Sequence, residues 1–424
     1  MAEQQRLNVD EPGNLAKELK EFLFERIKGQ ERAVKELAST LDLFQAGFRE
    51  AGRPICAVLF LGPSGVGKTL AAEVLAEFFF DSRNAFTKIA CSEYQEPHTI
   101  SSLRGSPPGY VGYYDPEDSY YNGTEPILSQ ANVDRHDYEY QRRTNKECLE
   151  AKEKISILLK EQQELEKEKA RLEHDKEQKS RKYQDINIQL NKIRNEVSEL
   201  FKRYLLYSPQ KNYRSIVLFD EVEKASDALH RLLLEILDKG KLTLANGNLT
   251  NFSNSFIILT SNVGSKKIAD ILNAKQIGFQ VASERGDNLL VDDLIYQESI
   301  KEAGKVFPPE FLGRLDTKIV FRPLGRENLK EILEIHIQDF LCLLVKNKQS
   351  VVLKIEEAVK EFILREATDR LEYGARLLKN KVQKHLKEPL SRLVNKGELK
   401  SGDVVRICLE NNGKKKITFY RETF

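Results

Sequence analysis

Two segments of the chain combine residue types that suit phosphate chemistry. The first, Gly-Pro-Ser-Gly-Val-Gly-Lys-Thr at residues 62–69, follows an apolar run that ends at Leu61 and precedes a helical stretch at 70–79. Glycines let backbone N–H groups curl around phosphate, and the start of a helix adds the positive end of its dipole. This pattern in this context predicts a phosphate-binding loop. Its members are Gly62, Pro63, Ser64, Gly65, Val66, Gly67, Lys68 and Thr69.

The second segment, Ser-Ile-Val-Leu-Phe-Asp-Glu at 215–221, has the pattern of a buried strand that ends in two carboxylates. Alone this pattern is weak, but paired with the phosphate loop it assigns roles. Lys68 would neutralise the β and γ phosphates, and Thr69 and Asp220 would hold Mg²⁺. Glu221 would act as the general base on the attacking water.

The elements around these segments predict an α/β fold. Strand-length apolar runs at 57–61, 86–90, 216–219, 256–260 and 319–321 alternate with helical stretches. This alternation is typical of a parallel sheet with helices on both faces. Beyond 323 the pattern is mainly helical and closes with a predicted hairpin, 404–409 and 416–420. We therefore predict a large domain at 14–322 and a smaller, mainly helical C-terminal domain at 323–424.

A third region, 138–207, interrupts the large domain with a sequence rich in Lys, Glu, Gln and Arg and without Gly or Pro. Apolar residues recur there at alternating spacings of three and four, which predicts a coiled coil. A hairpin is expected because both ends return to one sheet, while a single helix of roughly 90 Å is the alternative. The seam positions are Ala151, Ile155, Leu158, Gln162, Leu165, Leu172, Tyr183, Ile186, Leu190, Ile193, Val197, Leu200 and Tyr204.

Composition argues against several classes of partner. The chain has 424 residues with 67 basic and 65 acidic side chains, so its formal charge is only +2. This balance provides no general attraction to nucleic acid or to an anionic membrane surface. No run approaches the roughly 18 apolar residues that a membrane span needs. We expect a soluble, cytoplasmic protein with neither a nucleic-acid nor a membrane partner.

Several further motifs make the sequence resemble the Clp AAA+ unfoldases, in particular the second ATPase ring of ClpA, ClpB and ClpC. They occur in the family's order and, with the two segments above, cover nearly the whole chain outside the predicted coiled coil. They are Arg-Ile-Lys-Gly-Gln at 26–30, Ser-Pro-Pro-Gly-Tyr-Val-Gly-Tyr at 106–113, Leu-Phe-Asp-Glu-Val-Glu-Lys at 218–224, Thr-Ser-Asn-Val-Gly at 260–264, Phe-Pro-Pro-Glu-Phe-Leu-Gly-Arg-Leu-Asp at 307–316 and Tyr-Gly-Ala-Arg at 373–376.

The resemblance implies ATP as the nucleotide and adds roles for individual residues. Asn262 matches the sensor that helps to position the attacking water beside Glu221. Arg314 matches the arginine finger, whose guanidinium reaches the nucleotide of a neighbouring subunit in a homo-hexameric ring. Arg376 matches the second sensor, which reports nucleotide state from the small domain. Adenine contacts are implied for Ile27, Gly29 and Gln30.

The segment Gly109-Tyr110-Val111-Gly112 resembles the pore loop with which the family grips polypeptide substrates. Flanking glycines give a mobile loop, and an aromatic-aliphatic pair packs on an extended chain whatever its side chains are. Without the family context, this stretch would be interpreted as an ordinary turn.

Three features depart from the family. Little chain precedes 26–30, so neither an upstream ATPase ring nor an N-terminal substrate domain is expected. The coiled coil lies in a different ring from that of ClpB and ClpC, so its partner is unknown. Ile277-Gly278-Phe279 lies where protease-associated members carry a docking tripeptide, which suggests a ClpP-like protease partner.

Three functions compete at this point. The first is a motor that unfolds proteins and feeds them to a ClpP-like protease. The second is a remodelling or disaggregating chaperone that works without a protease and is recruited through the coiled coil. The third is a nucleotide-controlled scaffold. The intact catalytic set argues against the scaffold, Tyr110 favours threading, and the segment 277–279 would distinguish the first two functions.

Overall fold

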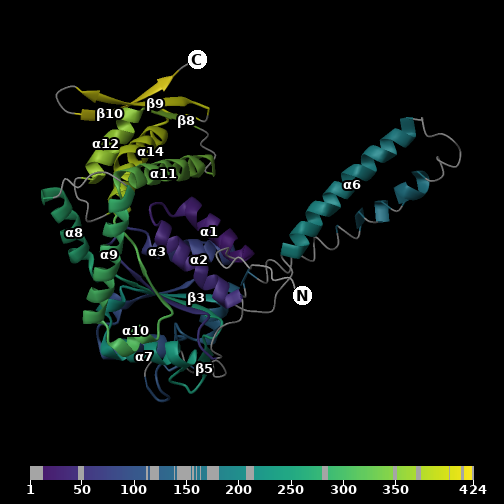
Figure 1. Cartoon of the computed structure of the whole chain (residues 1–424). Coiled ribbons are helices and arrows are strands. Elements are labelled where there is room, and N and C mark those ends of the chain that lie inside the picture. The colour runs from purple at the N-terminus through teal and green to yellow at the C-terminus, as the bar shows by residue number, and fades with distance from the viewer. Residues whose placement is uncertain are drawn as a thin grey trace, which may run out of the picture. The chain divides into compact units, whose positions relative to one another are not determined.

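The computed structural model describes most of the chain (Figure 1). The described residues are 13–45, 52–110, 113–114, 124–137, 139–140, 154, 157–158, 160–162, 164–169, 181–206, 214–278, 285–346, 351–368, 374–400, 402–411 and 415–422. They form two compact units, residues 1–130 with 216–424 and residues 131–215.

A five-stranded sheet with the order β2-β3-β6-β1-β7 forms the centre of the first unit. β2 runs parallel to β3, and β1 runs parallel to both β6 and β7. Every residue of β1 and β6 is buried, as expected for central strands whose two faces are both covered. The predicted α/β sheet is confirmed. The strands are β1 (Cys56–Leu61), β2 (Thr87–Ala90), β3 (Ser215–Asp220), β6 (Ser255–Ser261) and β7 (Thr317–Val320).

Helices cover both faces of this sheet, with α1, α2 and α3 on one side and α7 and α10 on the other (Figure 1). α7 buries four leucines and one isoleucine, at positions 229, 232, 233, 236 and 237, which is the spacing of a single apolar helix face. The helices of this domain are α1 (Asn14–Arg26), α2 (Glu31–Gln45), α3 (Lys68–Phe80), α4 (Ser101–Arg104), α7 (Asp227–Lys239), α8 (Ser265–Gly278), α9 (Arg285–Val306) and α10 (Pro309–Gly313). Short 3-10 turns at Cys91–Glu93, Pro97–Ile100 and Val222–Lys224, and a small hairpin of β4 (Lys241–Thr243) and β5 (Leu249–Asn251), complete it.

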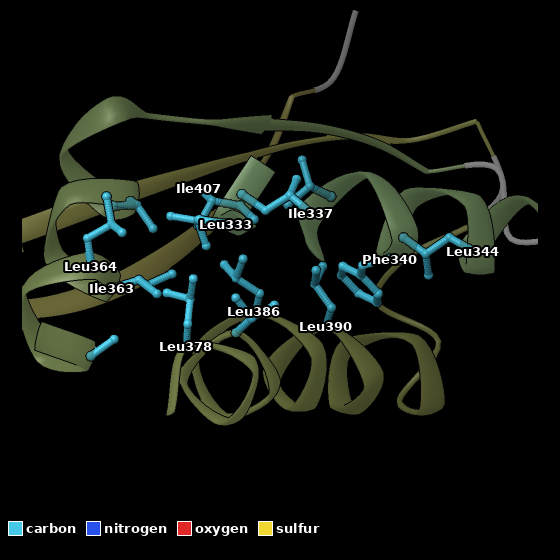
Figure 2. Packing of buried hydrophobic residues seen from close by; sticks show 14 of the residues in the cluster. Leu333, Ile337, Phe340, Leu344, Ile363, Leu364, Leu378, Leu386, Leu390 and Ile407 are labelled. Atoms are coloured by element: carbon cyan, nitrogen blue, oxygen red, sulfur yellow. The ribbon is translucent and has the colours of Figure 1, made fainter. Parts of the chain in front are cut away.

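The C-terminal region has its own apolar core, in which Leu333, Leu378, Leu386 and Ile407 are fully buried (Figure 2). Its helices are α11 (Arg326–Lys346), α12 (Glu357–Thr368), α13 (Gly374–Val382) and α14 (Glu388–Asn395), with a π-helical turn at Gln383–Lys387. β9 (Val404–Asn411) and β10 (Lys415–Glu422) form the predicted antiparallel hairpin. An unpredicted third strand, β8 (Val352–Ile355), pairs parallel to β9.

The second unit contains α6 (Arg181–Leu206) and an earlier helical segment within 154–169. Lys182 pairs with Glu168 at 2.8 Å and Arg194 with Glu166 at 3.4 Å, so later residues of α6 meet earlier residues of the other segment. The two helical segments therefore run antiparallel, which is the hairpin arrangement. Three seam residues, Ile186, Leu190 and Ile193, are buried. Five of the thirteen predicted seam positions lie outside the described side chains, and the coiled coil stays a prediction.

Within the part of the chain that the structure describes, no helix is both long and apolar enough to cross a membrane.

Candidate nucleotide site

The predicted phosphate loop connects the end of β1 to the start of α3. Gly62 leaves the strand with a φ of +142°, and a Cβ at this position would lie 2.3 Å from the backbone oxygen of Phe321. Only glycine fits so close to another backbone. α3 then begins at Lys68, directly after Gly67, so its first N–H groups face the loop.

Lys68 is buried and bends back over the loop. Its ammonium donates to the backbone oxygens of Gly62 at 2.6 Å and Pro63 at 2.7 Å, and to Asn262 Oδ1 at 2.9 Å. Burial lowers the pKa of Lys68 to about 8, against the opposing effect of Glu223, Asp220 and Glu221. Among the described residues no carboxylate lies within ion-pair distance of this ammonium. A buried cation bonded only to neutral oxygens is suited to a polyanion such as a nucleotide's phosphates.

Asp220 ends β3, and both of its carboxylate oxygens have partners. Oδ1 accepts a hydrogen bond from the Thr260 hydroxyl at 2.5 Å, and Oδ2 pairs with Lys88 on β2 at 2.9 Å. Burial acts to raise the pKa of Asp220, but the Thr260 hydroxyl and the Lys88 ammonium outweigh it, so the pKa lies below its usual value. The carboxylate is therefore held ionised, as a Mg²⁺ ligand has to be.

Glu221 adopts a left-handed backbone conformation, with φ of 60° and ψ of 51°. This turn ends the strand. The Oε1 atom of Glu221 accepts from Asn262 Nδ2 at 3.2 Å, and Oε2 pairs with Lys224 at 2.6 Å. A non-glycine residue is rarely found in this conformation and needs surrounding contacts to hold it there.

Asn262 joins the two halves of the site. Its side-chain Oδ1 accepts a hydrogen bond from Lys68, and its Nδ2 donates one to Glu221. One side-chain amide therefore links the lysine of the phosphate loop to the expected base. The backbone N–H of Asn262 is in turn fixed by Glu223 Oε1 at 3.1 Å. Four sequence-predicted residues, Lys68, Asp220, Glu221 and Asn262, are thus brought to one edge of the sheet.

The segment before α2 also contacts the loop. Gln30 is buried and donates to the backbone oxygens of Val66 at 3.1 Å and Arg322 at 2.8 Å. Gly29, with a φ of +72°, packs against Asn328 of α11, and Ile27 is buried. The residues expected to contact adenine therefore lie where the loop, the strand β7 and the C-terminal region meet.

The start of α13, in the C-terminal region, contacts the phosphate loop. The Ala375 N–H donates to the Gly65 backbone oxygen at 3.0 Å, and a Cβ at Gly374 would lie only 2.7 Å from that same oxygen. Arg376 follows and is exposed. Burial is the main cause of the lowered pKa of Lys68, and the positive charge of Arg376 lowers this pKa further. The two cations are therefore close enough to interact electrostatically.

Arg314 lies away from this cluster. Two residues later, Asp316 exchanges hydrogen bonds with Ala57 near the amino end of β1, donating at 2.9 Å and accepting at 2.7 Å. The phosphate loop follows the carboxyl end of β1, roughly 13 Å further along at about 3.3 Å per residue. The Arg314 guanidinium instead pairs with Asp238 of α7 at 2.6 Å.

Comparisons with known proteins assign this arrangement to a family. A family model described as AAA domain (Cdc48 subfamily) matches residues 53–117 and 152–318, and one described as the C-terminal, D2-small domain of ClpB protein matches 324–407. The chain is an AAA+ ATPase of the Clp type. It is 31% identical to the chaperone protein ClpB of Helicobacter hepaticus over 92% of this chain and 33% of that protein.

Two other relatives of this Clp-type ATPase have different descriptions. It is 30% identical to a chloroplastic ATP-dependent Clp protease ATP-binding subunit ClpA homolog of Brassica napus, over 97% of this chain and 36% of that protein. A cryo-EM reconstruction of Hsp104 with ATPyS and FITC casein shares the fold, with a TM-score of 0.59 and 22% identity over 95% of this chain and 51% of that one. The chain spans about a third of the length of its curated relatives.

The remaining predicted residues are only partly described. Tyr110 is 71% exposed and Gly109 precedes it, while Val111 and Gly112 lie outside the described residues. Ile277 and Gly278 are the last residues of α8, and Phe279 lies outside the described residues. The expected protease-docking loop is therefore helical in part, and its role stays a prediction.

Three residues that bond to the carboxylates of the site were not predicted from the sequence, namely Lys88, Lys224 and Thr260. Lys224 and Thr260 stand inside the motifs quoted above, but a motif does not say which side chain bonds to which. Lys88 lies on a neighbouring strand and is adjacent to Asp220 only through strand pairing, at the register Lys88 to Leu218. Only the sheet order could have placed it there.

Proposed function

We propose that copies of this chain assemble into a hexameric ring that hydrolyses ATP and thereby unfolds polypeptides and moves them through a central pore. The observation that carries the proposal is the division of the catalytic groups. Lys68, Glu221 and Asn262 converge at one edge of the sheet, while Arg314 lies near the other end of β1. An arginine at this end of β1 does not face the nucleotide site of its own subunit, and it would instead contact the nucleotide bound by a neighbouring subunit.

Within each subunit, the residues fit ATP with Mg²⁺. Lys68 and the N–H groups of the loop would bind the phosphates, and the oxygens of Thr69 and Asp220 would hold the ion, which supplies charge neutralisation when bound. Glu221 would accept the proton of the attacking water, and Asn262, which already touches Glu221, would orient that water. Arg376 would add positive charge from the C-terminal side.

Force on a substrate would be exerted by Tyr110. The Tyr110 side chain is 71% exposed, so packing against the described part of its own subunit covers little of it and does not explain an aromatic residue at this position. Placed around a ring axis, such side chains would grip an extended chain without selecting its sequence. Polypeptides are therefore the proposed substrates.

We propose that the threaded polypeptide passes on to a ClpP-like protease. One relative is described as an ATP-binding subunit of the Clp protease, and the segment 277–279 supplies candidate docking residues. Other relatives are described as chaperones, so a remodelling chaperone without a protease is the alternative outcome of the docking test. We further propose that the helical hairpin of the second unit binds a partner of its own.

Mixing two inactive variants tests the ring. Arg314→Ala subunits keep their own Lys68 and bind ATP, and Lys68→Ala subunits keep Arg314 but bind no nucleotide. If the site is shared, a mixture should hydrolyse ATP faster than either variant alone. No recovery in the mixture, or monomers alone in light scattering with ATP at micromolar protein, would contradict the ring.

Replacing Ile277 and Phe279 together by Ser tests the docking segment. Binding to a ClpP-type protease should be lost while ATPase and unfolding persist, because six modest contacts are multiplied by avidity. A variant that fails to unfold substrates with no protease present would show that the segment packs within the subunit. A wild-type ring that never binds such a protease would leave the chaperone as the function.

A further inference from the structure

The hydroxyl of Thr260 is enclosed between the two residues of the site that end β3. Thr260 is the second-last residue of β6 and is 1% exposed. Its Oγ1 accepts the N–H of Glu221 at 3.0 Å and donates to Asp220 Oδ1 at 2.5 Å. A backbone N–H can only donate and an ionised carboxylate can only accept, so the direction of both hydrogen bonds is fixed.

The hydroxyl of Thr260 binds the backbone at Glu221, a residue with an unfavourable conformation. Glu221 has a φ of 60°, a conformation that a non-glycine residue keeps only when its surroundings enforce it. The side chain of Glu221 is bound to Asn262 and Lys224, but its peptide N–H is bound to Thr260. The hydroxyl therefore holds the backbone from which the expected base projects.

The same hydroxyl orients the neighbouring carboxylate. With Oδ1 of Asp220 fixed by Thr260, Oδ2 is the oxygen that faces Lys88. Among the described residues, Thr260 is the one side chain that bonds to both Asp220 and Glu221. Among the described residues it forms no hydrogen bond with Lys68 or the phosphate loop, whereas Asn262 accepts one from Lys68.

We propose that Thr260 is a positioning residue for ATP hydrolysis, whose single hydroxyl ties the carboxylate of Asp220 to the backbone of Glu221. The proposal rests on the roles proposed above for these two residues. Without the hydroxyl, a part-buried N–H and a part-buried carboxylate oxygen lose their partner, and the peptide of Glu221 is released. Hydrolysis should suffer while nucleotide binding does not, because the phosphate loop keeps all of its contacts.

Three variants separate this role from ordinary packing. Thr260→Val removes the hydroxyl and keeps the shape, and Thr260→Ser keeps the hydroxyl. Thr250→Val is the matched control, because Thr250 is also a fully buried strand residue, on β5, whose hydroxyl donates to the Leu128 backbone oxygen at 2.7 Å. For each variant, kcat and KM for ATP, equilibrium binding of fluorescent ADP and thermal unfolding are measured.

Thr260→Val should lower kcat by roughly 10- to 100-fold, because small displacements of a catalytic group cost about this much. Its KM and its ADP affinity should stay within about threefold of wild type, as for a loss confined to the transition state. Thr260→Ser and Thr250→Val should keep kcat within about threefold. Should Thr260→Val be unfolded at the assay temperature, Thr260→Ala removes the same hydroxyl without placing a methyl group against polar atoms and should behave as predicted for Thr260→Val.

A Thr260→Val or Thr260→Ala enzyme with near-normal kcat would overturn the inference. Equal losses in Thr260→Ser, or in Thr250→Val, would also overturn it, since the hydroxyl at 260 would then have no special part. Glu221→Gln, measured alongside, distinguishes failure of the proposed base, Glu221, from failure of the positioning role of Thr260. If Glu221→Gln keeps half of the wild-type rate, the base assignment fails; if only Thr260→Val is unaffected, the positioning role alone fails.

Discussion

At the scale of single residues, Lys68 shows how the fold prepares a site for an anion. Its ammonium is buried against three neutral oxygens, and burial lowers its pKa to about 8 although three carboxylates act in the opposite direction. Burying a cation without a directly paired anion is costly, and a bound phosphate would relieve that cost.

Nucleotide affinity should therefore depend on pH. The protonated lysine binds phosphate, and above a pKa of about 8 the free site loses that proton, so binding must then take up a proton. The affinity for ADP without Mg²⁺ should fall by roughly tenfold from about pH 7.5 to about pH 9. Calorimetry in buffers of different ionisation enthalpy measures both the affinity and the proton uptake.

Lys68→Arg is the control for this titration, since a guanidinium stays protonated throughout the range. Its ADP affinity, even if weaker, should stay level with pH. A wild-type affinity that does not change with pH would mean that Lys68 titrates well above the range.

The residues of the site differ in how far the sequence could reveal them. Lys68, Asp220 and Glu221 lie at or just after the ends of apolar runs, and the phosphate-loop pattern together with the two carboxylates indicates phosphate chemistry. Asn262 was predicted from the family's motif. Thr260 stands in an apolar strand, where a threonine is ordinary. Its bonds reach across to residues about 40 positions earlier, and only the placement of β6 beside β3 makes them visible.

At the scale of elements, β1, β3 and β6 were predictable because each is an apolar run that is buried almost throughout. β2 and β7 are shorter and only partly buried, and each was predicted from its few apolar residues. β8 was not, because its residues alternate between exposed and half-buried and its partner β9 lies about 50 residues later in the chain. The sheet order β2-β3-β6-β1-β7 likewise depends on packing rather than on local pattern. That order places Lys88 against Asp220.

The contact between α13 and the phosphate loop gives a second prediction. Gly374→Ala would place a Cβ 2.7 Å from the Gly65 oxygen, at a φ of +49°, and should push α13 off the loop. Nucleotide affinity should fall by roughly threefold or more, in addition to about 1 kcal/mol of backbone strain. Equilibrium binding and thermal unfolding measure the two effects separately.

Gly397→Ala is the matched control, because Gly397 has a φ of +72° but no atom within 4 Å of the position that a Cβ would take. It should lose a similar amount of stability and keep its nucleotide affinity. Equal affinity losses in both variants would mean that the contact with Gly65 does not matter.

The helical hairpin gives a third prediction, within the second unit. Leu190 is 3% exposed and Ile188, on the same helix, is 66% exposed. Leu190→Ala should destabilise the hairpin by about 2 to 5 kcal/mol. Ile188→Ala should change it by less than about 0.5 kcal/mol. Hydrogen exchange of the α6 amides in the full chain measures both, and equal protection in the two variants would contradict the packing of the two helices.

At the scale of the whole molecule, the proposed arginine finger, Arg314, lies away from the nucleotide site of its own subunit, so under the proposal a single subunit would be catalytically incomplete. Arg314 is paired with Asp238 in the single chain, a contact that a neighbour's phosphates would replace. In the proposed ring, assembly and hydrolysis would thereby be coupled, because each site would lack its last cation until a neighbouring subunit supplies Arg314. Movement of a polypeptide through the proposed ring would in addition require a side chain that faces the ring axis.

Tyr110 is the residue proposed for that task, and its variants give the last prediction. Its side chain is 71% exposed and lies outside the nucleotide cluster, so Tyr110→Ala should keep ATP hydrolysis within about threefold of wild type. Unfolding of a tagged test protein should stop, because the aromatic face that packs on the substrate is gone. Tyr110→Phe keeps that face and should unfold the test protein at a near-normal rate. Parallel loss of hydrolysis and unfolding in Tyr110→Ala would mean that Tyr110 supports the fold of the subunit rather than the grip on the substrate.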